Sequence, residues 1–136
     1  MRKLVVTEFV SIDGVIEDPG GVNNTKHGGW VFEHINDDIW KFKLDEMLAS
    51  EAHLLGRRTY EEFAGAWPYR SGDEMADYIN AMKKYVVSTT LETVEWNNSH
   101  IIKENVAEEI RTLKKQSGKD LLVAGSAQLV TFLSQE

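Results

Sequence analysis

The sequence predicts a single α/β domain built on a mostly parallel β-sheet. Short runs of apolar and β-branched residues alternate with stretches whose apolar residues recur at helical spacing. Strands that alternate with helices imply right-handed crossovers, which place helices on both faces of a largely parallel sheet. The chain has 136 residues, enough for one hydrophobic core. No internal repeat or interdomain linker is visible, so we assign residues 1–136 to one domain.

The chain begins with a predicted buried strand and a long loop. Residues 4–10 are rich in apolar and β-branched side chains, and Val15-Ile16 is a second short run that could extend the strand. The turn-forming sequence Ser11-Ile12-Asp13-Gly14 lies between them. Residues 18–29 hold one proline, four glycines and two asparagines without a periodic apolar pattern. Connections of this length in compact domains are usually functional or disordered, so we expect a lid.

In the middle of the chain, helical patterns surround one apolar strand that ends in a glycine. The helix before the strand has a polar N-cap candidate and one apolar face, which are typical of a surface helix. The predicted elements are a helix from Asn36 or Asp37 to about Ser50, the strand His53-Leu54-Leu55 ending at Gly56, and helices over residues 59–66 and 72–82.

The last third of the chain repeats this alternation, and its first helix has signals at both ends. Asn105 and Glu108 form a capping-box pattern, apolar residues follow at i, i+4 and i+7, and Gly118 ends the helix. The other predicted elements are strands over residues 85–88, 100–102 and 121–124, and a final helix with Leu129, Phe132 and Leu133 on one face.

Composition argues against several classes of function. Fifteen Lys and Arg are scattered among twenty-two Asp and Glu, so the net charge of −7 leaves no basic stripe for nucleic acid. The absence of cysteine excludes disulfides and thiolate chemistry, and the four separated histidines predict no metal site. No stretch resembles a signal peptide or approaches membrane-spanning length, so we expect a cytoplasmic protein.

Two predicted strand-to-helix junctions share one design. An apolar strand ends at Gly56, followed by Arg57, and another ends at Gly125, followed by Ser126. A glycine there lets the backbone approach a ligand closely, while the N–H groups and dipole of the next helix favour a phosphate. Ligands of open α/β sheets bind at the carboxyl ends of the strands. A tight turn explains either glycine alone equally well, but two junctions together with Arg57 favour phosphate binding.

The sequence contains neither G-x-G-x-x-G nor a P-loop, so a nucleotide would bind by another scheme. Residues 55–60, Leu-Gly-Arg-Arg-Thr-Tyr, resemble the Gly-Arg-x-Thr segment of dihydrofolate reductases and of the riboflavin-biosynthesis (RibD) C-terminal reductase domain. Residues 5–14, 84–90 and 120–126 match the same family in order, and the chain is similar to its stand-alone bacterial branch. The resemblance implies a dihydrofolate-reductase-like three-layer αβα fold with a mostly parallel central sheet.

The resemblance also implies a site for NADPH. By this likeness Gly56, Arg57 and Thr59 would hold the cofactor phosphates, Ser88 and Thr89 would lie by the adenosine ribose and its 2′-phosphate, and Gly125 and Ser126 would contact the pyrophosphate. A planar guanidinium pairs bidentately with phosphate, which agrees with this assignment. For the two hydroxyl residues after the strand, a turn or helix-capping role is nearly as good an explanation. The sequence does not choose between NADPH and NADH.

Candidates on the substrate side are one carboxylate and three aromatic residues. If the likeness holds, Asp13 would lie near the nicotinamide end of the cleft, where it could orient or protonate the substrate. An Asx turn with Gly14 is the commoner use of Asp-Gly. Trp30, Tyr60 and Trp67 could line a pocket for a planar substrate, although packing in the core explains most such rings.

The C-terminus departs from the family pattern. Members normally continue past the position of Gln135-Glu136 with a strand and a hairpin beside the first strand. We therefore expect the first strand to be an uncovered edge, which natural proteins avoid. The chain is then either a fragment or is completed by a second copy in a homodimer.

Two functional hypotheses follow. The first is an NADPH-dependent reductase that transfers a hydride to a small heterocyclic substrate, either pterin-like or resembling the riboflavin precursor 5-amino-6-(5-phosphoribosylamino)uracil. The alternative is a non-catalytic, truncated reductase-like domain that acts in nucleotide binding or homo-oligomer assembly. A flavin or nucleotide sensor is a weaker third interpretation.

Overall fold

Five parallel strands form one sheet in the computed structural model, which describes residues 1–136. The strands are β1 (Leu4–Thr7), β2 (Ser50–Gly56), β3 (Lys83–Val87), β4 (Ser99–Ile102) and β5 (Asp120–Ala124), in the spatial order β1-β5-β2-β3-β4. The last strand of the chain thus lies between the first two. The carboxyl ends of β1, β5 and β2 are consequently adjacent at one edge of the sheet.

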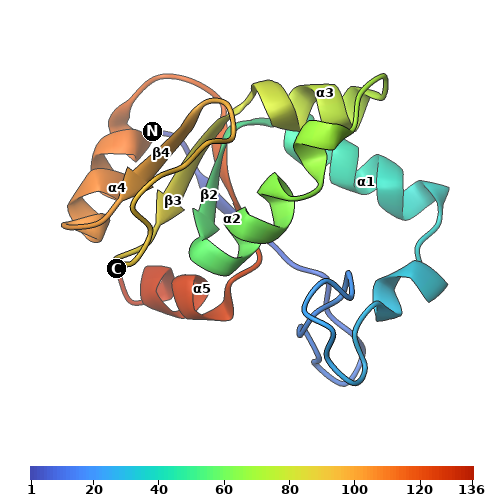
Figure 1. The fold of residues 1–136 in the computed structure, drawn as a ribbon. Helices are drawn as coiled ribbons and strands as arrows, with labels where there is room; N and C mark the ends of the chain where they lie inside the picture. Colours follow the sequence, from blue (N-terminus) through green and yellow to red (C-terminus); the bar gives the residue numbers. More distant parts are fainter.

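Helices cover both faces of the sheet, which gives three layers (Figure 1). The elements α1 (Asp37–Leu48), α2 (Arg57–Ala64) and α3 (Glu74–Ala81) pack on one face, and α4 (Val106–Lys115) and α5 (Ala127–Ser134) pack on the other. Two short 3-10 helices, η1 (Trp30–Glu33) and η2 (Trp67–Tyr69), lie in the connections. The predicted αβα architecture, consistent with a dihydrofolate-reductase-like fold, is confirmed, and every strand pair is parallel.

The two faces of the sheet explain why the central strands are apolar without interruption. Successive side chains of a strand point to opposite faces. Leu55 packs with the α1–α3 layer, whereas Leu54 and Val123 pack with the α4–α5 layer. Because both faces of β2 and β5 are covered, nearly every residue of these strands is buried. None of the five α-helices is both long and apolar enough to cross a membrane.

Several predicted boundaries differ from the observed ones. β1 ends at Thr7 rather than Val10, and β2 begins at Ser50 rather than His53. The sequence favoured a later start for β2 because Ser50 and Glu51 are polar. In the structure the buried Arg2 guanidinium pairs with the carboxylate of Glu51, so a polar residue is accommodated in the strand.

The predicted capping box before α4 is wrong. Asn105 occupies the N-cap position, but its φ is +51° and its side chain makes no capping hydrogen bond. Without a hydrogen bond from the first turn to Asn105, the reciprocal pair of side-chain bonds that defines a capping box does not form. Asn36, with φ −137°, does cap α1 through a 3.0 Å hydrogen bond from the N–H of Ile39.

Candidate functional site

The two glycine junctions meet at the carboxyl ends of β2 and β5, which are neighbouring parallel strands. A Cβ added to Gly56 would lie 2.6 Å from Oγ of Ser126, and one added to Gly125 would lie 2.7 Å from Oγ1 of Thr59. Each glycine therefore makes room for a side chain of the other junction. Gly125 also has φ +65°, a conformation that favours glycine. The two junctions form one continuous surface, as a shared ligand would require.

The helices that begin at these junctions differ in how their first N–H groups are satisfied. The N-cap of α2 is Gly56, which has no side chain to accept a hydrogen bond from the first turn. The first N–H groups of a helix have no partner within it, so this end of α2 is open to an anion. Ser126 caps α5 with its own hydroxyl, which accepts a 3.3 Å hydrogen bond from the N–H of Leu129.

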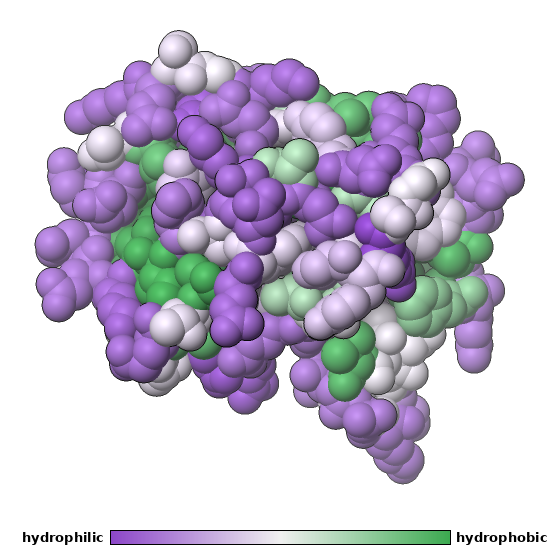
Figure 2. All heavy atoms as spheres, turned by 45° about the horizontal axis from the view of Figure 1, so that its top comes forward, coloured by the Kyte–Doolittle hydropathy of each residue, from purple (hydrophilic) through white to green (hydrophobic).

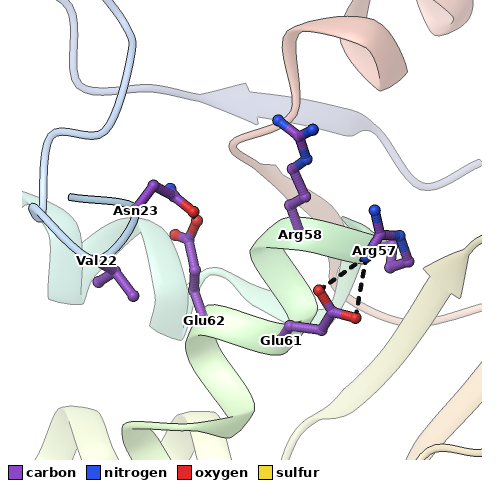
Figure 3. Close-up of a pocket in the computed structure, with 6 residues that line it drawn as sticks. All are labelled: Val22, Asn23, Arg57, Arg58, Glu61 and Glu62. Atoms are coloured by element: carbon purple, nitrogen blue, oxygen red, sulfur yellow. Dashed lines mark hydrogen bonds and ion pairs between the residues drawn. The ribbon is translucent and has the colours of Figure 1, made fainter. Parts of the chain in front are cut away.

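Two arginines lie in the first turn of α2 and differ in their partners (Figure 3). One nitrogen of Arg57 lies 3.1 and 3.2 Å from the two carboxylate oxygens of Glu61. Arg58 points away from Glu61 and makes no ion pair. An exposed i,i+4 pair contributes only about 0.3–0.5 kcal/mol, so a phosphate group can displace Glu61 from Arg57.

An open hollow lies between the first turns of α2 and the predicted lid loop. Its volume is about 340 Å³. The amide nitrogen of Asn23 donates a 2.6 Å hydrogen bond to Glu62 across it, which ties the loop to α2. The lining residues are Val22, Asn23, Arg57, Arg58, Glu61 and Glu62 (Figure 3). The loop therefore contributes to the walls of the same region as the first turn of α2.

The lid loop is organised around the buried carboxylate of Asp18. It accepts hydrogen bonds from the backbone N–H groups of Asn23 and Thr25, at 3.0 and 3.1 Å, and from the hydroxyl of Thr25. These bonds, first among them that from the N–H of Asn23, hold the pKa of Asp18 below its ordinary value of 3.8. Gly28 is needed beside it, because an added Cβ would lie 2.2 Å from Oδ2 of Asp18.

A polar cluster that sequence reasoning missed lies at the carboxyl end of β1, against α1. The hydroxyl of Thr7 donates a 2.8 Å hydrogen bond to Glu46 and accepts one from Lys43. The ammonium of Lys43 is 3.3 Å from Glu46 and 4.6 Å from the centre of the Phe9 ring. Glu8 adds a carboxyl group whose Oε1 is buried without a hydrogen-bond partner.

Local patterns gave little indication of this cluster. Lys43 and Glu46 belong to the charged residues of an otherwise ordinary amphipathic helix, and they meet Thr7 only through the tertiary fold. The one signal was the pair Thr7-Glu8, which interrupts the apolar run of the first strand. A polar break at the carboxyl end of a buried strand is a reason to consider a functional residue.

Comparison with known proteins identifies the family. A family model described as the RibD C-terminal domain matches residues 2–136. The chain belongs to this family. The RibD C-terminal domain is reductase-like and of the riboflavin-biosynthesis type, which confirms the resemblance drawn from the sequence. The uncharacterized protein YyaP of Bacillus subtilis (strain 168) is 28% identical over 134 residues, covering 96% of this chain. The chain spans 66% of that protein's length.

The RibD C-terminal likeness assigned Ser88 and Thr89 to the cofactor ribose. Ser88 follows β3 and is buried, and its hydroxyl accepts hydrogen bonds from the N–H groups of Thr90 and Leu91, at 3.2 and 3.1 Å. This is the turn role that the sequence left open as an alternative. Thr89 is exposed at the end of β3, beside the strand that ends in Gly56.

Asp13 is exposed in a turn between β1 and the lid loop. Its carboxylate accepts a 2.5 Å hydrogen bond from the hydroxyl of Ser11, and Gly14 follows with φ +86°. The N–H of Gly14 bonds to the carbonyl of Ser11. Local turn chemistry therefore explains the Asp-Gly pair in this RibD-type domain without a bound ligand.

The three aromatic candidates do not gather around the hollow beside α2. Tyr60 is buried in the core, and its hydroxyl accepts a 3.1 Å hydrogen bond from the N–H of Trp96. Trp67 packs against the same core cluster. Trp30 donates through its ring nitrogen to the carbonyl of Glu17 at the base of the lid loop. Of the three, Tyr60 has the clearest packing role in this RibD-type core.

Proposed function

We propose that this chain is an NADPH-dependent reductase that transfers a hydride to a small heterocyclic substrate. The substrate class is pterin-like or resembles 5-amino-6-(5-phosphoribosylamino)uracil. The observation that supports the proposal most is the interlocking of the Gly56 and Gly125 junctions, which brings two helix N-termini to one surface. Membership of a reductase-like family supports the type of chemistry.

The residues present fit a dinucleotide phosphate group. In the proposal, the uncapped first turn of α2 with Gly56, Arg57 and Thr59 binds phosphate, and the backbone N–H groups at Gly125 and Ser126 face the pyrophosphate. The hydroxyl of Ser126 is occupied as the cap of α5, so this residue would act through its backbone. When bound, NADPH would supply the hydride, while the protein supplies orientation and exclusion of water.

The ribose end of the cofactor is assigned to the turn after β3. The hydroxyl of Ser88 already accepts two backbone N–H groups, which makes it a support for the turn. Thr89 is exposed, so its hydroxyl is the freer of the two to donate to a 2′-phosphate. We therefore expect Thr89 to contact the cofactor and Ser88 to hold Thr89 in place.

The same likeness supports the residues proposed for the substrate side. Asp13 would orient the substrate from its exposed turn, and Trp30 and Trp67, which both keep exposed surface, would border a planar ring. Tyr60 would contribute from the buried face of α2. We place this function in the cytoplasm, in keeping with the sequence prediction.

A second copy of the chain is part of the proposal because β1 is an edge strand. Only β5 pairs with it, and the side chain of Val6 is 45% exposed there. Natural proteins seldom leave such an edge uncovered, which supports a homodimer. The same edge is the observation that favours the alternative, an assembly domain without catalytic activity.

Cofactor binding tests the proposal directly. We expect NADPH to raise the melting temperature of the wild-type protein, because a ligand of the folded state stabilises it. Arg57→Ala should weaken NADPH binding about tenfold or more, since a hydrogen bond to a charged group contributes roughly 1.5–3 kcal/mol. The measurement is a thermal-shift titration of both proteins, followed by calorimetry for the dissociation constants.

The matched control is Arg111→Ala, which removes an exposed, ion-paired arginine from α4. It should bind NADPH as the wild type does. NADH should lose affinity in Arg57→Ala as NADPH does, because the 2′-phosphate that it lacks is assigned to Thr89 and not to Arg57. An unchanged melting temperature of the folded wild type with saturating NADPH and NADP⁺ would overturn the reductase proposal.

A further inference from the structure

A carboxyl oxygen without a partner is buried at the carboxyl end of β1. Oε1 of Glu8 is shielded from solvent and accepts no hydrogen bond. The large majority of buried polar atoms in proteins have a hydrogen-bond partner, so an atom without one needs a physical explanation. Catalytic groups are one such reason, since a reactive carboxyl must keep an oxygen free for its substrate.

The charges around Glu8 come mainly from α1. Lys43 and Glu46 face the end of β1 and are paired with each other and with Thr7. Residues 123–128, which form the neighbouring β5–α5 junction, include no charged side chain. In the first turn of α2, Arg57 forms an ion pair with Glu61. Arg58 makes no ion pair, so its positive charge is the unpaired one in this turn.

Burial disfavours the ionised form of Glu8. Desolvation raises the pKa of Glu8 above its ordinary value of 4.5, and the positive charge of Lys43 partly opposes this effect. Lys43 contacts Thr7 and Glu46 and makes no hydrogen bond to Glu8, so it acts on Glu8 through its charge. A carboxyl group in this setting retains its proton at higher pH than a solvated one.

The register of the sheet places Glu8 beside the surface proposed for the cofactor. Thr7 pairs with Ala124, so Glu8 and Gly125 leave their neighbouring strands side by side. Adjacent strands lie about 4.8 Å apart, which puts the Glu8 backbone within reach of a ligand that crosses Gly125. Asp13, in contrast, lies farther along the chain in an exposed turn and is already bonded to Ser11.

We propose that Glu8 is the proton donor that accompanies hydride transfer. This inference rests on the proposed reductase function and adds a residue to it. The substrate is a C=N or C=O compound whose carbon accepts a hydride from the dihydronicotinamide. The π electrons move to the nitrogen or oxygen, which takes the proton as the O–H bond of the Glu8 carboxyl breaks. Glu8 is left as a carboxylate and regains a proton from water.

The test uses the charge of the nicotinamide ring and needs no substrate. The ring is positive in NADP⁺ and neutral in NADPH, and the rest of the two molecules titrates alike. If Glu8 faces the ring, its ionised form favours NADP⁺. The affinity for NADP⁺ relative to NADPH should then rise about tenfold as pH increases through the titration of Glu8.

Three variants test whether Glu8 causes the pH dependence of the affinity ratio. Glu8→Gln has the same size but no ionisable group, so its affinity ratio should not change with pH. Lys43→Met removes the charge that stabilises the carboxylate, and it should move the inflection of the ratio to higher pH. Glu95→Gln changes an exposed carboxylate that makes no hydrogen bond, and it should behave as the wild type. Calorimetry between pH 4.5 and 8 would provide the constants.

The possible outcomes separate the two proposals. Absence of binding by both cofactors would overturn the reductase function, and the role of Glu8 with it. Binding with a ratio that is independent of pH in the wild type, or that rises equally in Glu8→Gln, would overturn the role of Glu8 alone. If Glu8→Gln does not fold, a shifted inflection in Lys43→Met supports Glu8, and an unshifted one overturns it.

Discussion

Lys84 is a lysine in the hydrophobic core, with an exposed fraction of 0%. Its ammonium donates to the carbonyls of Asn80 and Asn97, at 2.8 and 3.0 Å, and lies 4.1 Å from the centre of the Trp96 ring. No carboxylate pairs with it. Burial therefore lowers the pKa of Lys84 to about 8. Its register neighbour His53 is also buried, and desolvation followed by the charge of Lys84 lowers the pKa of His53 to about 3.

We predict that the free energy of unfolding rises between about pH 8 and pH 10.5 because of Lys84. In this interval the unfolded chain keeps the proton that the folded protein has lost, so a higher pH favours folding. Lys84→Met should abolish this rise and also destabilise the protein at pH 7 by about 1–3 kcal/mol, since two buried carbonyls lose their donor. Urea unfolding at several pH values measures both effects.

Lys83→Met is the control, because Lys83 is exposed in the same strand. It should keep the slope of stability against pH that the wild type shows. A wild-type slope in Lys84→Met would mean that Lys84 remains charged throughout this range and that the core tolerates the charge by other means.

At the scale of elements, local periodicity predicted which segments are helices and strands, because each buries one face or both. Boundaries depended on contacts far apart in the sequence. β2 starts at Ser50 because Arg2 neutralises Glu51, whereas Asn105 occupies the N-cap position of α4 without making a capping hydrogen bond. The glycines of the two junctions were predictable from their position. The side chains for which they make room, Ser126 and Thr59, followed only from the strand order.

The lid loop is an element whose order depends on one carboxylate. Since the folded protein holds the pKa of Asp18 below 3.8, the stabilisation from its ionised form is present above that value and is lost as pH falls below it. Asp18→Asn should loosen the loop at neutral pH. Exchange of the Asn23 and Thr25 amide hydrogens should become about tenfold faster, because both N–H groups lose a charged acceptor.

Hydrogen exchange followed by mass spectrometry or NMR can measure this change. Glu17→Gln is the control, because it changes an exposed carboxylate at the start of the same loop. The core strands should keep their protection in both variants. Equal exchange in Asp18→Asn and the wild type would show that the glycines and the contact with Glu62 hold the loop without Asp18.

At the scale of the whole molecule, the strand order determines which polar groups meet. The sequence predicted a mostly parallel sheet from the alternation of strands and helices, and the family likeness supplied the residues proposed for the cofactor. The cluster of Thr7, Glu8, Lys43 and Glu46 could not be predicted, since it forms only when α1 packs against the end of β1. On the outside, apolar residues gather in a few patches of an otherwise hydrophilic surface (Figure 2). Val6 of the β1 edge is among the exposed apolar residues.

Val6→Pro tests whether β1 pairs with a second copy. The carbonyl of Lys3 accepts the N–H of Leu121 from β5, and strand geometry then directs the N–H of Val6 toward the free edge. Proline at this position removes only an edge-facing donor, so the monomer should fold with little loss of stability. Two copies related by a two-fold axis would pair their β1 strands antiparallel, and proline would interrupt that ladder.

We expect a dimer for the wild type and for Val6→Thr, and a monomer for Val6→Pro, by size-exclusion chromatography with light scattering. A wild-type monomer, or a Val6→Pro variant that remains dimeric, would exclude the β1 edge as the interface.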